Sequence, residues 1–174
     1  MPLRIAQLGQ PVLRRQAHPI PPEVVLSSDC QAFLQAMRET LAEAGGVGLA
    51  GPQVFADFRL FLARVGTPGP EGGPVAPEVF INPELTVLTE ETESRWEGCL
   101  SFPELLVLVP RAKRIAIKYL DETGQPRERE LTDFAARVVQ HEYDHLEGIL
   151  TLDRAASTRH IIKASEAEAV LGSP

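Results

Sequence analysis

The stretch QHEYDH, residues 140–145, places His141 and His145 four positions apart. In a helix, residues at i and i+4 lie on one face, one above the other, so the two imidazoles would form a metal-chelating pair. Glu142 then lies about 100° around the helix from His141, where it can flank a bound metal without being a ligand. This H-E-x-x-H pattern favours a metal site over a pair of core histidines satisfied by hydrogen bonds.

The residues around the motif predict the helix that it requires. Thr132 or Asp133 can cap the start, and Gly148 can end it. Successive residues of one helix face are then four, three and four positions apart, and they form an inward-facing stripe of Phe134, Val138, His141 and His145. The two histidines therefore continue an apolar face that turns toward the core.

Composition limits the classes of protein that fit. A chain of 174 residues with 44% hydrophobic residues predicts a single domain over residues 1–174, large enough to bury one core. The net charge of −7 and the scattered acidic residues give no footprint for DNA or for an anionic membrane. No apolar run resembles a signal peptide or a membrane span, so we expect a soluble cytoplasmic protein. Cys30 and Cys99 are too few for a disulfide framework.

Two helices are expected besides the metal-binding one. The first 26 residues are rich in proline and predict an extended arm. A helix should follow from Ser27 or Ser28 and end at Gly45-Gly46. A C-terminal helix is expected from about Ser157 to Val170. Residues 66–77, rich in Gly and Pro, predict a surface loop.

Short apolar and β-branched runs predict several strands, two of them separated by a break at Pro83. The expected strands are Phe58 to Val65, Val79 to Asn82, Leu85 to Thr89, Arg95 to Leu100, Leu105 to Val109, Arg114 to Leu120 and Arg127 to Leu131. Strands and helices do not alternate as βαβ units. The predicted fold is therefore α+β, with antiparallel β-sheets packed around a central metal-binding helix, an N-terminal helix and a C-terminal helix.

Two histidines leave a catalytic metal one protein ligand short, because such sites usually take three. Cys99, in the segment EGCLS at residues 97–101, offers a thiolate. Glu166 lies 21 positions after His145, as in a metallopeptidase with two histidines and one glutamate. Cys30 and His160 are weaker candidates. The residues alone leave the choice between Cys99 and Glu166 open.

The chain resembles the peptide deformylase family, which carries the three signatures G-x-G-x-A-A-x-Q, E-G-C-L-S and H-E-x-x-H. Residues 46–53 match the first except that Gly51 stands where the second Ala is usual, and residues 97–101 and 141–145 match the other two. The similarity runs roughly from Pro11 to Arg154. Each motif alone could arise by chance, whereas the ordered trio is highly specific.

The resemblance implies a fold, a metal and a reaction. It makes Cys99, His141 and His145 the ligands of one divalent metal ion per chain, and Glu142 the catalytic acid and base. Fe(II) is the typical ion in the family, and zinc, nickel or cobalt can take its place. The implied reaction removes the formyl group from the N-terminal formyl-methionine of new polypeptides and releases formate.

The resemblance also implies how substrate is held. The Gln53 side-chain amide and the Leu100 backbone N–H would stabilise the oxyanion, and the substrate backbone would pair with Val47 and Gly48. An apolar pocket for methionine would have walls at Phe134 and Val138, with Val47 opposite. The implied partners are formyl-methionyl nascent peptides, with transient ribosome association as a further expectation.

Two rival functions remain at this stage. One is a zinc metallopeptidase that uses His141, His145 and Glu166. The other is a homologue that binds peptide ends without catalysis, for which the departure at Gly51 is the best argument. Replacement of Ala by Gly removes one methyl group and adds backbone freedom, a destabilisation of at most about 1 kcal/mol. Gln53 is still in place, so we expect activity to survive.

Charged residues near the motifs suggest further contacts. Glu97 and Arg111 flank the Cys99 segment, and we expect them to pair because a buried carboxylate needs a cation. Asp144 is either a partner of a ligating histidine or an exposed helix residue. The sequence leaves open whether Arg95 and Arg137 narrow the pocket.

Overall fold

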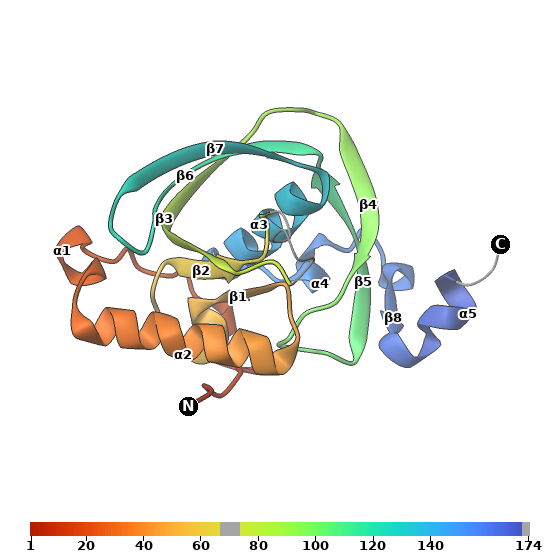
Figure 1. The fold of residues 1–174 in the computed structure, drawn as a ribbon. Coiled ribbons are helices and arrows are strands. Elements are labelled where there is room, and N and C mark those ends of the chain that lie inside the picture. Colours follow the sequence, from red (N-terminus) through yellow and green to blue (C-terminus); the bar gives the residue numbers. More distant parts are fainter. Residues whose placement is uncertain (67–73, 172–174) are drawn as a thin grey trace.

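A computed structural model describes residues 1–66 and 74–171, and the helix α3 (Asp133–Leu146) lies at its centre. Strands arch over this helix on one side and flank it on another (Figure 1). The buried side chains of α3 include Ala136, Val138, Val139 and Leu146. They share a core with aromatic and aliphatic residues of the neighbouring strands, which fixes the helix that carries the H-E-x-x-H motif.

A five-stranded sheet covers α3, and all of its neighbouring strands are antiparallel, in the order β1-β2-β3-β6-β7. The strands are β1 (Gly48–Ala50), β2 (Leu60–Ala63), β3 (Glu78–Val87), β6 (Arg114–Leu120) and β7 (Pro126–Thr132). β1 lies at one edge, and among the described residues no further strand pairs with its outer side in this sheet. That edge reaches the site described below.

The side chains of β2 point alternately to the two faces of this sheet, and each face packs against a helix. Leu60 and Leu62 belong to a core cluster with α2 (Ser28–Ala44), whereas Phe61 and Ala63 belong to the cluster around α3. Successive residues of a strand point to opposite faces, so one apolar run supplies both cores. Burial of each large side chain contributes roughly 1.5–3 kcal/mol.

The remaining strands form a second, three-stranded antiparallel sheet in the order β4-β5-β8. They are β4 (Thr92–Glu97), β5 (Leu105–Ala112) and β8 (Ile161–Lys163). In Figure 1 this sheet stands beside α3, at an angle to the larger one. Cys99 follows the end of β4, so the small sheet delivers the EGCLS segment to the helix.

The predicted helix caps agree with the structure at α2. Ser27 accepts a hydrogen bond from the Cys30 N–H at 3.2 Å, and Gly45 ends the helix with φ 68°. At α3 the start is as predicted, although Thr132 makes no side-chain cap hydrogen bond. The other α-helices of the described residues are α1 (Pro22–Val25), α4 (Thr151–Arg154) and α5 (Ala167–Leu171).

The N-terminal arm is laid against the body as expected. Leu13 is buried beside Phe102 and Leu150, and the Ala17 N–H donates to the Leu146 carbonyl at 2.8 Å. A Cβ on Gly148 would lie 2.7 Å from the Arg14 carbonyl oxygen, so only glycine allows the arm to cross here. The arm therefore closes the end of α3.

The α+β fold class is confirmed, but the predicted break at Pro83 is wrong. β3 runs through this position, with a register shift between Ile81 and Glu84. A bulge accommodates the missing N–H of proline while pairing resumes on both sides. Asn82 adopts φ 49° in the bulge, and its side chain bonds both the N–H and the carbonyl of Ile20, at 2.8 and 2.7 Å.

A C-terminal helix is present, but its predicted start at Ser157 is wrong. Ile161 and Ile162 form β8, opposite Val107 and Leu106 of β5. The open edge of β5 offers backbone hydrogen bonds that local helix propensity cannot outweigh. The helix begins only at Ala167. Residues 67–73 of the predicted 66–77 loop lie outside the described residues.

Across residues 1–66 and 74–171, no helix combines the length and the apolar character needed to cross a membrane.

Candidate metal centre and active site

Cys99, His141 and His145 converge at the centre of the molecule. One ligand atom from each lies within 4.8 Å of the others, and Cys99 Sγ is 3.4 Å from His145 Nε2. The two imidazole centroids are 5.1 Å apart. One sulfur and two imidazole nitrogens form a donor set that suits zinc and other borderline divalent metals. The residues present therefore fit a metal ion.

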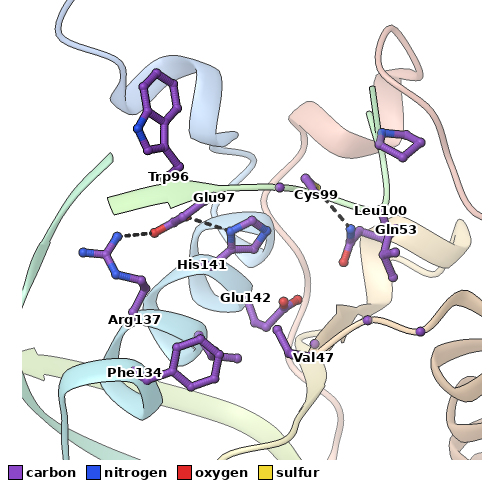
Figure 2. Close-up of a pocket in the computed structure, with 16 residues that line it drawn as sticks. Val47, Gln53, Trp96, Glu97, Cys99, Leu100, Phe134, Arg137, His141 and Glu142 are labelled. Atoms are coloured by element: carbon purple, nitrogen blue, oxygen red, sulfur yellow. Dashed lines mark hydrogen bonds and ion pairs between the residues drawn. The ribbon is translucent and has the colours of Figure 1, made fainter. Parts of the chain in front are cut away.

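The two histidines differ in protonation. Burial would lower the pKa of His141, but hydrogen bonds with Cys99 and Glu97 outweigh this and raise the pKa to about 10, so this imidazole gives up a proton when a metal binds. Burial lowers the pKa of His145 well below its usual value, so its imidazole is neutral. His141 Nδ1 donates to Glu97 Oε2 at 3.0 Å, which directs its other nitrogen toward Cys99 (Figure 2). A carboxylate behind a ligating histidine fixes the orientation of the ring and the position of its proton.

Glu97 stays ionised in this buried position. Burial would raise its pKa, but hydrogen bonds from His141 and Arg111 outweigh this and lower the pKa to about 2. Arg111 Nε and Nη2 contact the two carboxylate oxygens at 3.1 and 3.0 Å. The expected Glu97–Arg111 pair is therefore present.

Glu142 is 3% exposed and lies beside the cluster without belonging to it. Its Oε2 has no hydrogen-bond partner among the described residues. Burial raises the pKa of Glu142 to about 7. A carboxyl group with a pKa near the operating pH can both accept and return a proton.

Gly48 is placed where a side chain would collide with Glu142. A Cβ on Gly48 would lie 2.1 Å from Glu142 Oε1 and 2.5 Å from its Cδ. We expect Gly48→Ala to retain the metal and to lower kcat by about 10²-fold, because a shift of about 1 Å in a reacting group has that effect. Metal content and steady-state kinetics check this.

The matched control is Gly66→Ala, where the nearest contact of a Cβ is the flexible Glu78 carboxylate at 3.3 Å. This variant should retain its kcat. Normal turnover in Gly48→Ala would contradict the claim that Glu142 is confined by Gly48.

Gln53 is 1% exposed and has a fixed orientation. Its Oε1 accepts from the Ala50 N–H at 2.9 Å, which leaves Nε2 directed at Ser101 Oγ, 3.2 Å away, and at Cys99 Sγ, 3.6 Å away. A donor held in place before charge develops is what oxyanion stabilisation requires. Leu100 lines the same cavity.

A cavity of about 410 Å³ is lined by Gln53, Cys99, His141 and Glu142. Its apolar lining includes Val47, Phe134 and Val138, and Figure 2 shows Phe134 and Val47 on the same side of Glu142. Phe134 is 53% exposed, so it forms the rim of the cavity and does not belong to the core. Trp96 also lines the cavity.

Most of the chain is similar in sequence to one known enzyme family. The profile of the polypeptide deformylase family matches residues 2–160. The chain belongs to this family. The peptide deformylase of Thermotoga maritima is 43% identical over 159 residues, which cover 91% of this chain and 90% of that protein. Peptide deformylase 2 of Nostoc sp. is 39% identical, with coverage of 94% and 92%.

Solved deformylase structures share the fold. The crystal structure from Thermotoga maritima superposes with a TM-score of 0.81 at 42% identity, and covers 90% of this chain and 99% of that one. A class I type b deformylase from Acinetobacter baumannii with Met-Ala-Ser bound has a TM-score of 0.81 at 34% identity, with 88% and 98% covered. This chain is therefore a metal-dependent hydrolase that removes the formyl group from N-terminal formyl-methionine.

Several contacts in this deformylase differ from the predictions. Among the described residues, the Asp144 side chain pairs with no histidine, and it is buried between Arg111 and Arg154. Arg154 Nη2 lies 2.6 Å from Asp144 Oδ1. Asp144 therefore neither supports a ligating histidine nor lies on the helix surface, because it forms ion pairs with Arg111 and Arg154. Arg95 pairs with Glu93 on the surface, whereas Arg137 lines the cavity.

Sequence reasoning left the place of Arg137 open and missed Trp96, and both residues line the cavity of the deformylase site. Arg137 is four positions before His141, and helical spacing could have placed it beside that ligand. Trp96 directly precedes the EGCLS motif, and this adjacency is the only signal in the sequence for its place at the cavity.

The two rival functions lose their structural support. Glu166 lies exposed in a 3₁₀ turn, outside the cluster of Cys99, His141 and His145. The structure explains why glycine occupies position 51, because a Cβ on Gly51 would lie 2.6 Å from the Phe58 carbonyl oxygen. The departure from the usual Ala therefore fits the close approach of the 56–58 segment and leaves Gln53 in place.

Proposed function

We propose that this deformylase binds one divalent metal ion through Cys99, His141 and His145, and that Glu142, Gln53 and the Leu100 N–H carry the reaction. The observation that supports this most strongly is the cluster of three ligand atoms within 4.8 Å, beside a buried glutamate. We propose Fe(II) as the ion, with zinc, nickel or cobalt able to replace it, because a mixed sulfur and nitrogen donor set accepts all of them.

Glu142 moves the proton in the proposed reaction. A bound divalent metal lowers the pKa of its water from about 15.7 toward about 7 and polarises a carbonyl oxygen. Glu142 accepts the proton of the attacking water and then delivers it to the departing amine. The products are formate and a peptide with a free N-terminal methionine. The pKa of about 7 for Glu142 suits both transfers.

Gln53 and Leu100 hold the charge that develops on the formyl oxygen. The Gln53 amide is oriented by Ala50, so little reorganisation is needed when the oxyanion forms. The Leu100 N–H is the second proposed donor, next to the ligand Cys99. Together they lower the energy of the transition state more than that of bound substrate.

We expect Gln53→Leu to lower kcat by about 10²- to 10³-fold, which is the usual cost of one oxyanion donor. KM should change little, since a neutral formyl oxygen accepts only a modest hydrogen bond. Loss of the bond to the Ala50 N–H should also cost about 1 kcal/mol of stability. Steady-state kinetics and a melting curve check both effects. A raised KM with normal kcat would mean that Gln53 only holds the loop.

Substrate is proposed to lie along the open edge of β1. An extended peptide would pair its backbone with Val47 and Gly48, a mode that is insensitive to side-chain identity. The methionine side chain would enter the cavity between Phe134, Val138 and Val47. The Acinetobacter baumannii enzyme with Met-Ala-Ser bound supports a peptide of this kind as ligand.

We further propose that residues 1–174 form one catalytic domain that works in the cytoplasm on formyl-methionyl nascent peptides. Transient association with the ribosome would bring the enzyme to these chains as they emerge.

Formate release from formyl-Met-Ala-Ser, measured on anaerobically prepared protein, tests this function. The expected products are formate and intact Met-Ala-Ser in equal amounts. Cleavage of the Met–Ala bond would indicate a peptidase instead. A metal-loaded protein that releases no formate would contradict the proposal.

A further inference from the structure

We propose that Arg137 is a positioning residue that sets where His141 lies relative to Cys99. This inference rests on the metal site proposed above and goes beyond it by assigning a task to a residue that contacts neither metal nor substrate in that scheme. Arg137 is 6% exposed and comes from α3. Its guanidinium group is directed at the small sheet (Figure 2).

One carboxylate joins Arg137 to the metal ligand. Arg137 and His141 are four residues apart on α3 and therefore share a face. Glu97 of β4 spans both, because its Oε1 accepts from Arg137 Nη1 at 2.6 Å while its Oε2 accepts from His141 Nδ1 at 3.0 Å. Arg137 therefore shares with Arg111 the task of orienting Glu97, and through it His141.

Arg137 also binds the backbone of the small sheet. Nη1 donates to the Val109 carbonyl of β5 at 2.9 Å, and Nη2 donates to the Glu93 carbonyl of β4. Cys99 follows β4, whereas both histidines belong to α3. Arg137 therefore ties together the two units that supply the three ligands.

A second tie lies further along the helix, where Arg111 of β5 contacts Asp144. The two ties hold α3 at residues 137 and 144, on either side of His141. With Arg137 removed, α3 would keep its contacts with β5 through Arg111 and through Gln140, whose side chain bonds the N–H and the carbonyl of Ala112 at 3.1 and 2.8 Å. Its hydrogen bonds to β4 would be reduced to the contact between His141 and Glu97. Glu97 would keep both hydrogen bonds from Arg111 but would lose the shorter one, at 2.6 Å, that Arg137 donates to its Oε1.

Cobalt-loaded protein provides a readout that does not depend on turnover. The d–d absorption bands of Co(II) report the arrangement of its ligands, and competition with a chelator gives its dissociation constant. We expect Arg137→Met to shift the bands and to weaken Co(II) binding by about 10- to 100-fold, the range found when outer-shell partners of a metal site are removed. Arg137→Lys should recover most of the affinity, because it keeps a charge beside Glu97.

The matched control is Arg129→Met, which removes the 2.6 Å ion pair with Glu78 in the large sheet. It should lower the melting temperature and leave the cobalt spectrum and affinity unchanged. Should Arg137→Met not fold, Arg137→Gln takes its place, since that side chain is too short to span the same contacts.

The outcomes separate this inference from the proposed function. Wild-type protein that binds cobalt, together with an Arg137 variant of identical spectrum and affinity, would overturn the positioning role alone. Wild-type protein that binds no cobalt would contradict the proposed metal site and the inference with it.

Discussion

Glu142→Gln is expected to lower turnover by about 10²- to 10⁴-fold, the contribution of a general acid and base, while the metal stays bound. The amide has the size of the carboxylate and can still contact water, but it cannot accept the proton. The Glu142 carboxylate occupies the space that a Cβ on Gly48 would need, so a replacement of the same size is the appropriate one. Metal analysis and kcat measured on one sample check both parts.

Gly66→Ala, outside the site, serves as the control for expression and handling. Loss of the metal in Glu142→Gln would show that Glu142 is a ligand and would contradict the proposed division between ligands and base. Retention of wild-type turnover would mean that another group moves the proton.

Cys99→Ser is expected to weaken metal binding by more than about 100-fold, since loss of an outer-shell partner alone costs about 10- to 100-fold. A serine hydroxyl is not ionised at neutral pH and is a poor replacement for a thiolate. Glu166→Gln should bind metal as the wild type does, because Glu166 lies exposed and outside the cluster. Metal content after dialysis against a chelator distinguishes the two variants.

The reverse result, with metal lost from Glu166→Gln and retained by Cys99→Ser, would return the metallopeptidase hypothesis to first place.

Local patterns were sufficient for much of the fold. The hairpin strand β6 has the predicted bounds, Arg114–Leu120, and α2 begins and ends at the predicted cap residues. These elements are determined by neighbours in sequence, namely turn residues, caps and periodicity. The antiparallel α+β class followed from the absence of βαβ units.

The errors arose where distant contacts decide the structure. Pro83 signals a break locally, but β2 and β6 both pair with β3 and carry it through the bulge. The Ala- and Glu-rich C-terminal segment favours a helix, yet Ile161 and Ile162 complete the edge of β5. No local pattern reveals that β5 has an open edge.

The site shows the same limit. Spacing and motif resemblance were enough to name Cys99, His141 and His145, which the fold brings together. They could not show that Glu97 supports His141 while Asp144 binds two arginines, because both carboxylates lie close to the motifs in sequence. That difference depends on how the small sheet packs against α3.

X-ray absorption spectroscopy of the zinc-loaded wild type tests the ligand assignment most directly. We expect one sulfur at about 2.3 Å and two imidazole nitrogens at about 2.0–2.1 Å from the metal, with the remaining position filled by oxygen. A first shell of nitrogen and oxygen without sulfur would contradict it.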